Sequence, residues 1–331
     1  MKNYTATIER YNNMQYRNCG ESGLKLPAVS LGMWHNFGDN ADFDNMCKMC
    51  FTAFDLGITH FDLANNYGPE AGSAETNFGK ILNGYMKNYR DELIISTKAG
   101  YYMWPGPYGD FGSRKYLISS IDQSLKRMNL EYVDIFYHHR MDPNTPLYET
   151  MWALNDIVKS GKALYIGLSN YDGETMVRAT EILIELKCPF IINQNRYSIF
   201  DRTVEKNGLL ESAIQKKKGV IIFSPLAQGL LTERYIDGIP ADSRVRTDGR
   251  FLKEQSISED VMLKVLKLNS IAKERGQTLA QMALSWLYSK EGITSVLIGA
   301  SNPKQIIENV KMLNNITFSS KELQEIDNIV L

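Results

Sequence analysis

Short apolar segments alternate with longer amphipathic segments along most of this chain. The amphipathic segments repeat apolar residues at helical spacing, and the apolar segments between them have the length of buried strands. Buried strands separated by helices indicate a parallel sheet covered by helices, and eight such units close into a barrel. We therefore predict an α/β protein whose single domain, residues 1–331, is a (β/α)8 TIM barrel. The expected strands are 28–31, 59–62, 93–97, 133–137, 163–167, 190–193, 219–223 and 295–298, and the expected helices are 43–56, 73–82, 113–128, 146–159, 173–186, 204–217, 280–288 and 303–313.

Three segments lie outside this repeat. Residues 16–26 read as an N-terminal β-hairpin that turns at 20–23. After the seventh strand, residues 228–258 form a long polar loop, and a further helix is expected at 259–275. An insertion of this length at the carboxyl face of a barrel is more often functional than accidental.

Composition narrows the classes of function. The 331 residues carry a formal charge of −1, so no broad electrostatic attraction to nucleic acid or acidic lipid is expected. The sequence has no apolar stretch of membrane-spanning length and no secretion signal at its start, and we expect a cytoplasmic protein that binds neither membrane nor nucleic acid. Cys47 and Cys50 form a C-x-x-C pair, but they fall on the apolar face of a predicted helix and read as core residues.

A doubly wound dinucleotide-binding fold is the main alternative. No two glycines occur at spacing i, i+2, so the chain contains no G-x-G-x-x-G loop. No tyrosine is followed by lysine four residues later, and no Walker A loop is present. If the chain binds a nicotinamide cofactor, it does so without those loops.

Four polar residues stand where predicted strands end: Asp62, Tyr67, Lys98 and His139. Because the strand ends of a β/α barrel converge on one face, residues far apart in sequence can meet in one pocket there. A phenol beside an ammonium and a carboxylate suggests a proton donor whose pKa is tuned by its neighbours.

The chain resembles the aldo-keto reductases over nearly its whole length. The resemblance rests on motifs in the family's order: LGMWHNFG, GITHFDLANNYG, TKAG, YVDIFYHHR, GKALYIGLSN, INQNRYS, FSPLAQGLLTERY and IGASNPKQIIEN. Within the family the chain is similar to the branch that contains bacterial L-glyceraldehyde 3-phosphate reductase and the potassium-channel β subunits. The resemblance implies a catalytic tetrad of Asp62, Tyr67, Lys98 and His139 and no metal.

The chemistry of this tetrad can be argued independently. Reduction of a carbonyl needs a hydride on carbon and a proton on oxygen, and a tyrosine can donate that proton. We expect Lys98 to lower the pKa of Tyr67, Asp62 to hold Lys98 in place, and His139 to orient the substrate oxygen as a neutral donor. Strand alternation sends His138 and His139 to opposite faces, and the family pattern selects His139. His138 is then packed or solvent-facing, and a zinc pair is not expected.

The resemblance also implies a site for NADP(H). Ser169, Asn170 and Gln194 would hold the nicotinamide carboxamide, and Phe223 would stack on its ring. Ser301 and Arg234 suggest a 2′-phosphate and hence NADPH, with Lys304 nearby. The remaining expected cofactor contacts are Trp34 and Asp62; Ser224, Leu226, Gln228 and Arg244 at the pyrophosphate under the long loop; and Gly299, Gln305, Glu308 and Asn309 at the adenosine end.

Aromatic residues after the first and third strands are expected to form the substrate pocket. They are Trp34, Tyr101 and Trp104, with Tyr102 and Tyr108 beside them. A narrow aromatic pocket suits small aldehydes such as methylglyoxal, glyceraldehyde or glyceraldehyde 3-phosphate, and His35 and Arg140 are conceivable phosphate partners.

A second class of function stays open at this point, because the channel β subunits imply that the scaffold can serve as a cofactor-sensing interaction module. Those subunits carry asparagine where this chain has His139, and the short N-terminal segment shows no inactivation-type tail. Both differences favour a working enzyme, and the branch implies a homo-oligomer, a tetramer or octamer.

Overall fold

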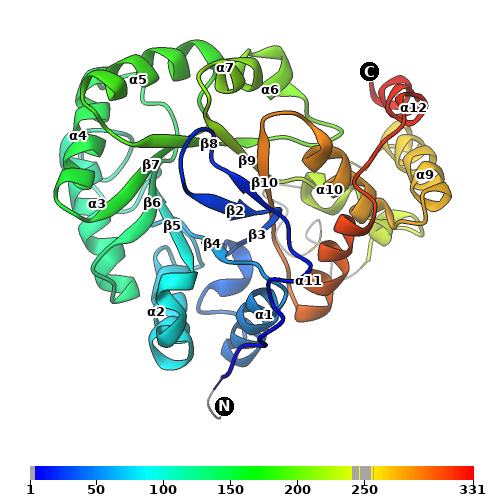
Figure 1. Ribbon diagram of the computed structural model, residues 1–331, viewed down its shortest axis with the longest axis horizontal. Coiled ribbons are helices and arrows are strands. Elements are labelled where there is room, and N and C mark those ends of the chain that lie inside the picture. Colours follow the sequence, from blue (N-terminus) through cyan, green and yellow to red (C-terminus); the bar gives the residue numbers. More distant parts are fainter. Residues whose placement is uncertain (1–3, 241–245, 247–254, 256) are drawn as a thin grey trace.

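A closed barrel of eight parallel strands forms the centre of the protein. The computed structural model describes residues 4–240, 246, 255 and 257–331. The strands pair in chain order, and β10 closes the barrel by pairing with both β9 and β3. They are β3 (Val29–Gly32), β4 (His60–Asp62), β5 (Ile94–Ala99), β6 (Val133–His138), β7 (Ala163–Ser169), β8 (Phe190–Arg196), β9 (Gly219–Phe223) and β10 (Ile293–Ile298). The predicted TIM barrel is confirmed (Figure 1).

Helices surround the barrel and cover the outer faces of its strands. Neighbours contact one another in sequence from α2 through α5 to α7, and α11 packs against both α10 and α1, so the ring closes beside the first helix. Every residue of β6 and β10 is buried, as expected for strands that have helices on one face and the barrel interior on the other. The helices of the ring are α1 (Phe43–Asp55), α2 (Ser73–Ile81), α3 (Arg114–Met128), α4 (Leu147–Lys159), α5 (Gly173–Glu185), α7 (Leu209–Gln215), α10 (Leu279–Ser289) and α11 (Pro303–Val310).

Shorter helical turns extend or link these elements. Helix α2 continues into a π-helical turn, and the segment after β9 begins with two 3-10 turns. Among the described residues, these shorter elements are η1 (His35–Phe37), η2 (Leu82–Met86), η3 (Lys87–Glu92), α6 (Thr203–Lys206), η4 (Ala227–Gly229), η5 (Glu233–Tyr235) and η7 (Lys311–Asn314).

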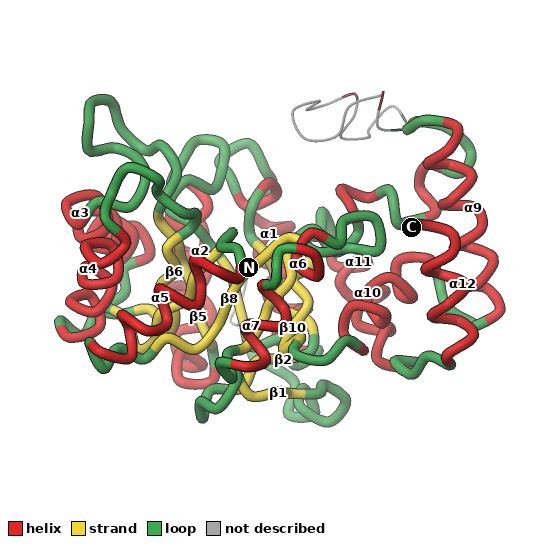
Figure 2. Tube along the Cα trace, turned by 90° about the horizontal axis from the view of Figure 1, so that it is seen from above, coloured by secondary structure: helices red, strands yellow, loops and turns green. Residues whose placement is uncertain are grey.

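The predicted N-terminal hairpin is also confirmed. Its strands, β1 (Tyr16–Asn18) and β2 (Lys25–Pro27), pair antiparallel and lie below the barrel in Figure 2. Cys19 and Leu26 pack with Ile135 and Ile221 from the barrel strands in one apolar cluster. The hairpin therefore covers the end of the barrel where the strands begin.

Inside the barrel, a large aromatic side chain depends on a glycine of the neighbouring strand. Tyr137 on β6 is fully buried, and a methyl group on Gly167 of β7 would lie 2.2 Å from its ring. Such a distance is far below van der Waals contact, so only glycine at position 167 leaves room for the ring.

Two helical predictions differ from the structure. The single helix expected at 204–217 is wrong, because the chain forms α6 and α7 with Gly208 between them in the left-handed region at φ 74°. An additional helix, α12 (Ser320–Val330), was not predicted; a capping box of Ser319 and Glu322 starts it. It packs against α9 (Glu259–Glu274), which was predicted. Figure 2 shows this pair beside the barrel, and Glu322 forms an ion pair with Arg275.

No helix within the described ranges is long and apolar enough to cross a membrane.

Candidate active site

The four candidate catalytic residues lie together at the carboxyl ends of three neighbouring strands. Asp62 is the last residue of β4, Lys98 stands near the end of β5, and His139 follows β6 directly. The amide of His139 donates to the carbonyl of Ala99 at 2.9 Å, which continues the pairing of β5 and β6 by one residue. Tyr67 reaches the same place from the turn after β4, as its ring contacts with Lys98 and His139 show.

Lys98 and Asp62 form a buried ion pair. The Lys98 ammonium lies 2.5 Å from Asp62 Oδ2 and also donates to the carbonyl of Leu63 at 2.5 Å. Neither side chain is exposed. Burial lowers the pKa of Lys98, and the charge and hydrogen bond of Asp62 oppose that change. The carboxylate therefore helps to keep the buried amine protonated.

The phenol of Tyr67 lies next to this ion pair. Its ring centroid is 5.0 Å from the Lys98 ammonium and 5.9 Å from the centroid of His139. Burial raises the pKa of Tyr67 well above its usual value, and the charge of Asp62 raises it further. The net change is therefore upward, against the lowering of this pKa that the sequence led us to expect, and burial is its largest cause. Tyr67 holds its proton at neutral pH, which is the state that a proton donor requires.

His139 is a buried neutral imidazole. Burial lowers its pKa well below the usual value, and the nearby charge of Lys98 lowers it further. Its Nδ1 is buried and has no hydrogen-bond partner among the described residues. The ring of Tyr101 stands perpendicular to it at 4.6 Å, and the backbone carbonyl of His139 accepts a hydrogen bond from Asn170. These contacts fix the position of the ring beside Tyr67.

His138 lies away from this centre. Its Nδ1 is 2.7 Å from the hydroxyl of Tyr171, and its ring packs against Gly112. Burial lowers its pKa to about 4. The two adjacent histidines therefore occupy different environments, and within the described residues no group of three His, Cys, Asp or Glu side chains could hold a metal ion.

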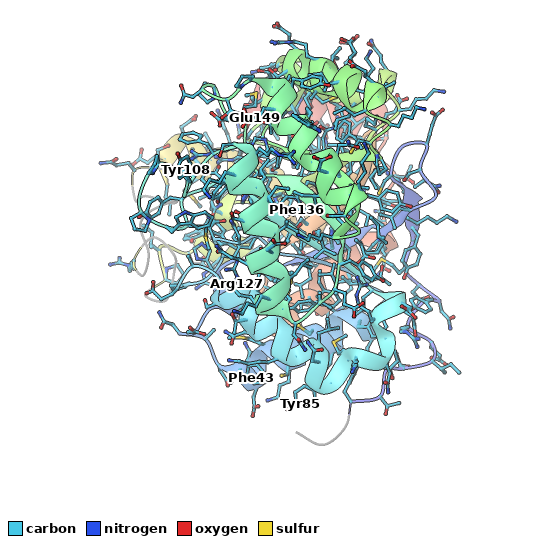
Figure 3. The ribbon with its side chains drawn as sticks, turned by 90° about the vertical axis from the view of Figure 1, so that its left-hand side faces the viewer. Phe43, Tyr85, Tyr108, Arg127, Phe136 and Glu149 are labelled. Atoms are coloured by element: carbon cyan, nitrogen blue, oxygen red, sulfur yellow. The ribbon has the colours of Figure 1, made fainter. Side chains whose placement is uncertain are left out.

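The aromatic residues expected to form a pocket wall do not all reach the tetrad. Trp34 lies 6.2 Å from Tyr67 between ring centroids, and Tyr101 contacts His139. Trp104 packs on Tyr116 instead, at 5.1 Å. The other two expected wall residues, Tyr102 and Tyr108, are 60% and 51% exposed, and Tyr108 lies in the loop that precedes α3 (Figure 3).

Of the two proposed phosphate partners, Arg140 is already engaged. Its guanidinium donates to the carbonyl of Gly100 at 2.7 Å and to Asp110 at 2.6 Å, and it lies 4.4 Å from the ring centroid of Tyr101. Arg140 thus ties both ends of the 100–110 loop to the strand end that carries His139. The ring of His35 lies against that of Trp34, with centroids 3.8 Å apart and the ring planes tilted by 37°.

The residues expected to hold a nicotinamide carboxamide meet at neighbouring strand ends. Ser169 pairs with Gln194 in the register of β7 and β8, and the Asn170 amide donates to Ser169 Oγ at 3.3 Å. Gln194 also donates to Asp62 Oδ1 at 3.1 Å, which links this group to the tetrad. Phe223 ends the next strand, half-buried. A hydroxyl and two amides beside an aromatic ring fit a flat amide-bearing heterocycle.

The segment after β9 has an unusual backbone. Ser224, Ala227 and Gln228 all lie in the left-handed region, with φ between 47° and 61°. The amide of Gln228 donates to Ser224 Oγ at 3.1 Å, and Leu226 lies between these turns. Positive φ in non-glycine residues often marks a functional site. Arg234 follows as an exposed residue of η5, whereas Arg244 and much of the predicted loop 228–258 lie outside the described residues.

At the expected adenosine end, the hydrogen-bond donors of Ser301 already have a partner within the chain. Gln305 Oε1 accepts from the amide of Ser301 at 2.8 Å and from its hydroxyl at 3.2 Å. Gly299 has open space where a side chain would begin. Glu308 forms an ion pair with Lys311, and Asn309 is buried. A cofactor 2′-phosphate that accepts hydrogen bonds from the Ser301 amide and hydroxyl would therefore have to displace the Gln305 carboxamide.

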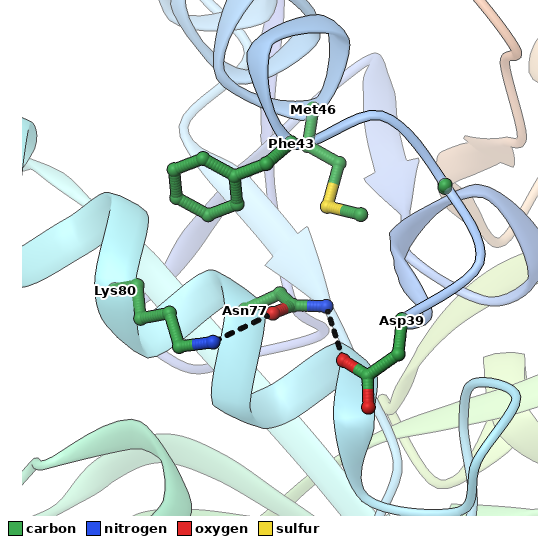
Figure 4. A pocket seen from close by; sticks show the side chains of 6 residues that line it. Asp39, Phe43, Met46, Asn77 and Lys80 are labelled. Atoms are coloured by element: carbon green, nitrogen blue, oxygen red, sulfur yellow. Dashed lines mark hydrogen bonds between the residues drawn. The ribbon is translucent and has the colours of Figure 1, made fainter.

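Two hollows lie away from the tetrad. One, of about 370 Å³, is bordered by Asp39, Phe43 and Met46, with Asn77 hydrogen-bonded to both Lys80 and Asp39 (Figure 4). The other, of about 560 Å³, lies between η3 and the end of α3. Neither is lined by a predicted site residue.

The sequence interpretation missed two polar residues next to Asp62. Ser96 Oγ donates to Asp62 Oδ1 at 2.6 Å, and His60 Nε2 lies 2.9 Å from Ser96 Oγ. The signal was available: His60 stands two residues before Asp62, and Ser96 stands two residues before Lys98. Residues at this spacing share a face of a strand, and here that face is the barrel interior.

Comparisons with known proteins agree with this geometry. The family model described as "Aldo/keto reductase family" matches residues 28–331. The chain is 57% identical over 327 residues to L-glyceraldehyde 3-phosphate reductase of Escherichia coli (strain K12), covering 98% of this chain and 94% of that protein. It is 36% identical over 309 residues to a probable voltage-gated potassium channel subunit beta of Arabidopsis thaliana, covering 92% of each chain.

Proposed function

Because the chain belongs to the aldo/keto reductase family, we propose that it reduces small aldehydes to alcohols with NADPH as the hydride donor. The observation that carries this proposal is the Lys98–Asp62 ion pair, buried directly beside the neutral phenol of Tyr67. A buried ion pair of this kind is costly to maintain for stability alone. Its position next to a proton donor supports a role in catalysis.

The proposed mechanism assigns one task to each member of the tetrad. Tyr67 donates its proton to the carbonyl oxygen of the substrate, and a bound nicotinamide cofactor would supply the hydride that the carbonyl carbon requires. Lys98 stabilises the phenolate that Tyr67 becomes, and Asp62 holds the ammonium charged and in place. His139, neutral at physiological pH, orients the substrate oxygen without competing as a proton source.

The nicotinamide would lie against Phe223, with its carboxamide held by Ser169, Asn170 and Gln194. Because Gln194 also hydrogen-bonds Asp62, this placement would bring the hydride donor to the proton donor. The pyrophosphate would follow the turns at 224–228, and the adenosine would lie near Gly299 and the start of α11.

The proposed substrates are small aldehydes such as methylglyoxal, glyceraldehyde or glyceraldehyde 3-phosphate. Trp34 and Tyr101 support this choice, because their aromatic rings border Tyr67 and His139. The name of the 57% identical relative supports a three-carbon aldehyde as the first compound to assay.

The second candidate is an NADP(H)-binding module that senses redox state or binds a partner. It is favoured by the similarity to a probable potassium channel subunit beta. The deciding experiment measures NADPH oxidation at 340 nm with methylglyoxal or glyceraldehyde 3-phosphate in excess over protein. Many turnovers per protein molecule support the enzyme, whereas oxidation that stops at one NADPH per chain supports the binding module.

A binding measurement tests the cofactor. We expect NADPH to bind at least about tenfold more tightly than NADH, a difference of about 1.4 kcal/mol. Fluorescence titration measures both dissociation constants, and equal values would contradict the assignment of NADPH.

A further inference from the structure

A chain of hydrogen bonds crosses the barrel interior from the last strand to Asp62. Ser295 on β10 and Ser30 on β3 have their hydroxyl oxygens 2.7 Å apart. Ser30 Oγ lies 2.9 Å from His60 Nδ1, and His60 Nε2 lies 2.9 Å from Ser96 Oγ. Ser96 then meets Asp62 Oδ1. All five side chains are buried.

The direction of each bond in this chain follows from proton counting. Asp62 accepts from Lys98 as an ionised partner, so the single hydroxyl proton of Ser96 must point to Asp62. Ser96 can then only accept from His60, which requires a proton on His60 Nε2. Burial lowers the pKa of His60 to about 4, so at neutral pH its Nδ1 carries no proton and accepts from Ser30.

We propose that His60 is a positioning residue for the acid–base centre, acting as the Nε2–H tautomer that fixes the Ser96 hydroxyl as a donor to Asp62. This inference rests on the proposed function only for its effect on turnover. With Ser96 and Gln194 both donating to Oδ1, Oδ2 is left to the Lys98 ammonium. His60 thereby sets, through Ser96, the orientation of the carboxylate that holds Lys98 beside Tyr67.

The tautomer can be tested without any assay of activity. Nitrogen NMR of the full chain labelled with ¹⁵N-histidine distinguishes a protonated ring nitrogen from an unprotonated one, and His60→Gln identifies the signals by their loss. The expected result at pH 7 is a protonated Nε2 and an unprotonated Nδ1. A protonated Nδ1, or an imidazolium at pH 7, would overturn the proposal even if the protein is an active reductase.

The positioning role is tested with two substitutions of His60. Glutamine keeps an N–H donor at about the reach of Nε2, whereas leucine removes it. His60→Leu is expected to lower kcat about tenfold or more, because small displacements of catalytic groups are costly, while His60→Gln retains most of the activity. The dissociation constant of NADPH is expected to be the same in both variants and in the parent protein.

A matched control separates this effect from loss of any buried hydroxyl. Ser285 on α10 is buried and hydrogen-bonded on both sides, yet it lies outside the chain of bonds. Ser96→Ala is expected to lower kcat about tenfold, and Ser285→Ala to leave it within about twofold at temperatures where both are folded. Equal kcat for His60→Leu and His60→Gln, or equal loss in the two serine variants, would overturn the role. Absence of turnover in the parent protein would instead contradict the proposed function and leave the tautomer test intact.

Discussion

The Lys98 ammonium and the Asp62 carboxylate lie 2.5 Å apart with no exposed surface on either side chain. Removing one partner of such a pair leaves the other as an uncompensated buried charge. Stability and its dependence on pH should therefore report on this pair directly.

Asp62→Asn is expected to reduce the free energy of unfolding by about 3–5 kcal/mol at pH 7. The pKa of Lys98 is already lowered by burial, and without Asp62 it falls further. The folded variant then binds fewer protons than its unfolded chain, so its stability rises with pH up to the unfolded pKa of lysine. The deficit relative to the parent protein should shrink by up to about 1.4 kcal/mol per pH unit across that range.

Urea unfolding at several pH values between 7 and 10 measures this effect. The double variant Asp62→Asn, Lys98→Met lacks the charge and serves as its control, with no pH-dependent deficit expected. A deficit in Asp62→Asn that is constant with pH would contradict the assignment to Lys98.

Tyr67→Phe tests the proton donor. The substitution removes only the hydroxyl, and we expect kcat to fall by about 10² or more, because positioned acid catalysis commonly contributes that much. The dissociation constant of NADPH should not change. Tyr148 on α4 is 45% exposed and is not a member of the tetrad, so Tyr148→Phe provides the control. Undiminished turnover in Tyr67→Phe would remove the role proposed for this phenol.

Arg140 and Asp110 are expected to act together on the loop beside Tyr101. The side chains of this ion pair are 27% and 29% exposed, and such exposure limits the free energy of the interaction to about 1 kcal/mol. Arg140→Gln and Asp110→Asn should each raise the KM for glyceraldehyde about fivefold, and the double variant should be no worse than either. Lys264→Gln, which breaks an exposed pair on α9, is the control.

The choice of substrate separates this role from phosphate binding. If Arg140 instead held a substrate phosphate, Arg140→Gln would impair reduction of glyceraldehyde 3-phosphate alone, and Asp110→Asn would not reproduce the effect.

Gly167→Ala tests the packing of the barrel interior. The added methyl group would lie 2.2 Å from the ring of Tyr137, so the ring or the strand must shift. We expect a loss of about 1–3 kcal/mol in the free energy of unfolding. Gly23→Ala, where the added methyl group meets nothing within 4 Å, should change it far less. Similar unfolding midpoints for the two variants would show that the interior absorbs the methyl group without strain.

Much of the fold could be predicted because its signals are local. Each barrel strand is a short segment between longer amphipathic ones, and strand ends alone brought Asp62, Lys98 and His139 to one face. The single helix expected at 204–217 failed because apolar spacing continues across Gly208, whose left-handed backbone breaks the helix. Helix α12 depends on contacts with α9 and Arg275, which are distant in sequence.

Electrostatics was harder to predict than position. The pKa of Tyr67 moves upward because of burial and the charge of Asp62, and both depend on distances that sequence does not contain. Likewise, Arg140 looked available to a ligand, yet Gly100 and Asp110 already bind it. Hydrogen bonds between side chains and loops cannot be predicted until the conformation of the loops is known.

The closure of the barrel by β10 has a consequence for synthesis on the ribosome. Ser295, the far end of the hydrogen-bond chain to Asp62, belongs to the last strand made, and β3 pairs with that strand. A nascent chain can therefore hold all four tetrad residues well before their surroundings are complete. Until β10 emerges, β3 and β9 present unpaired edges, which are sites for aggregation.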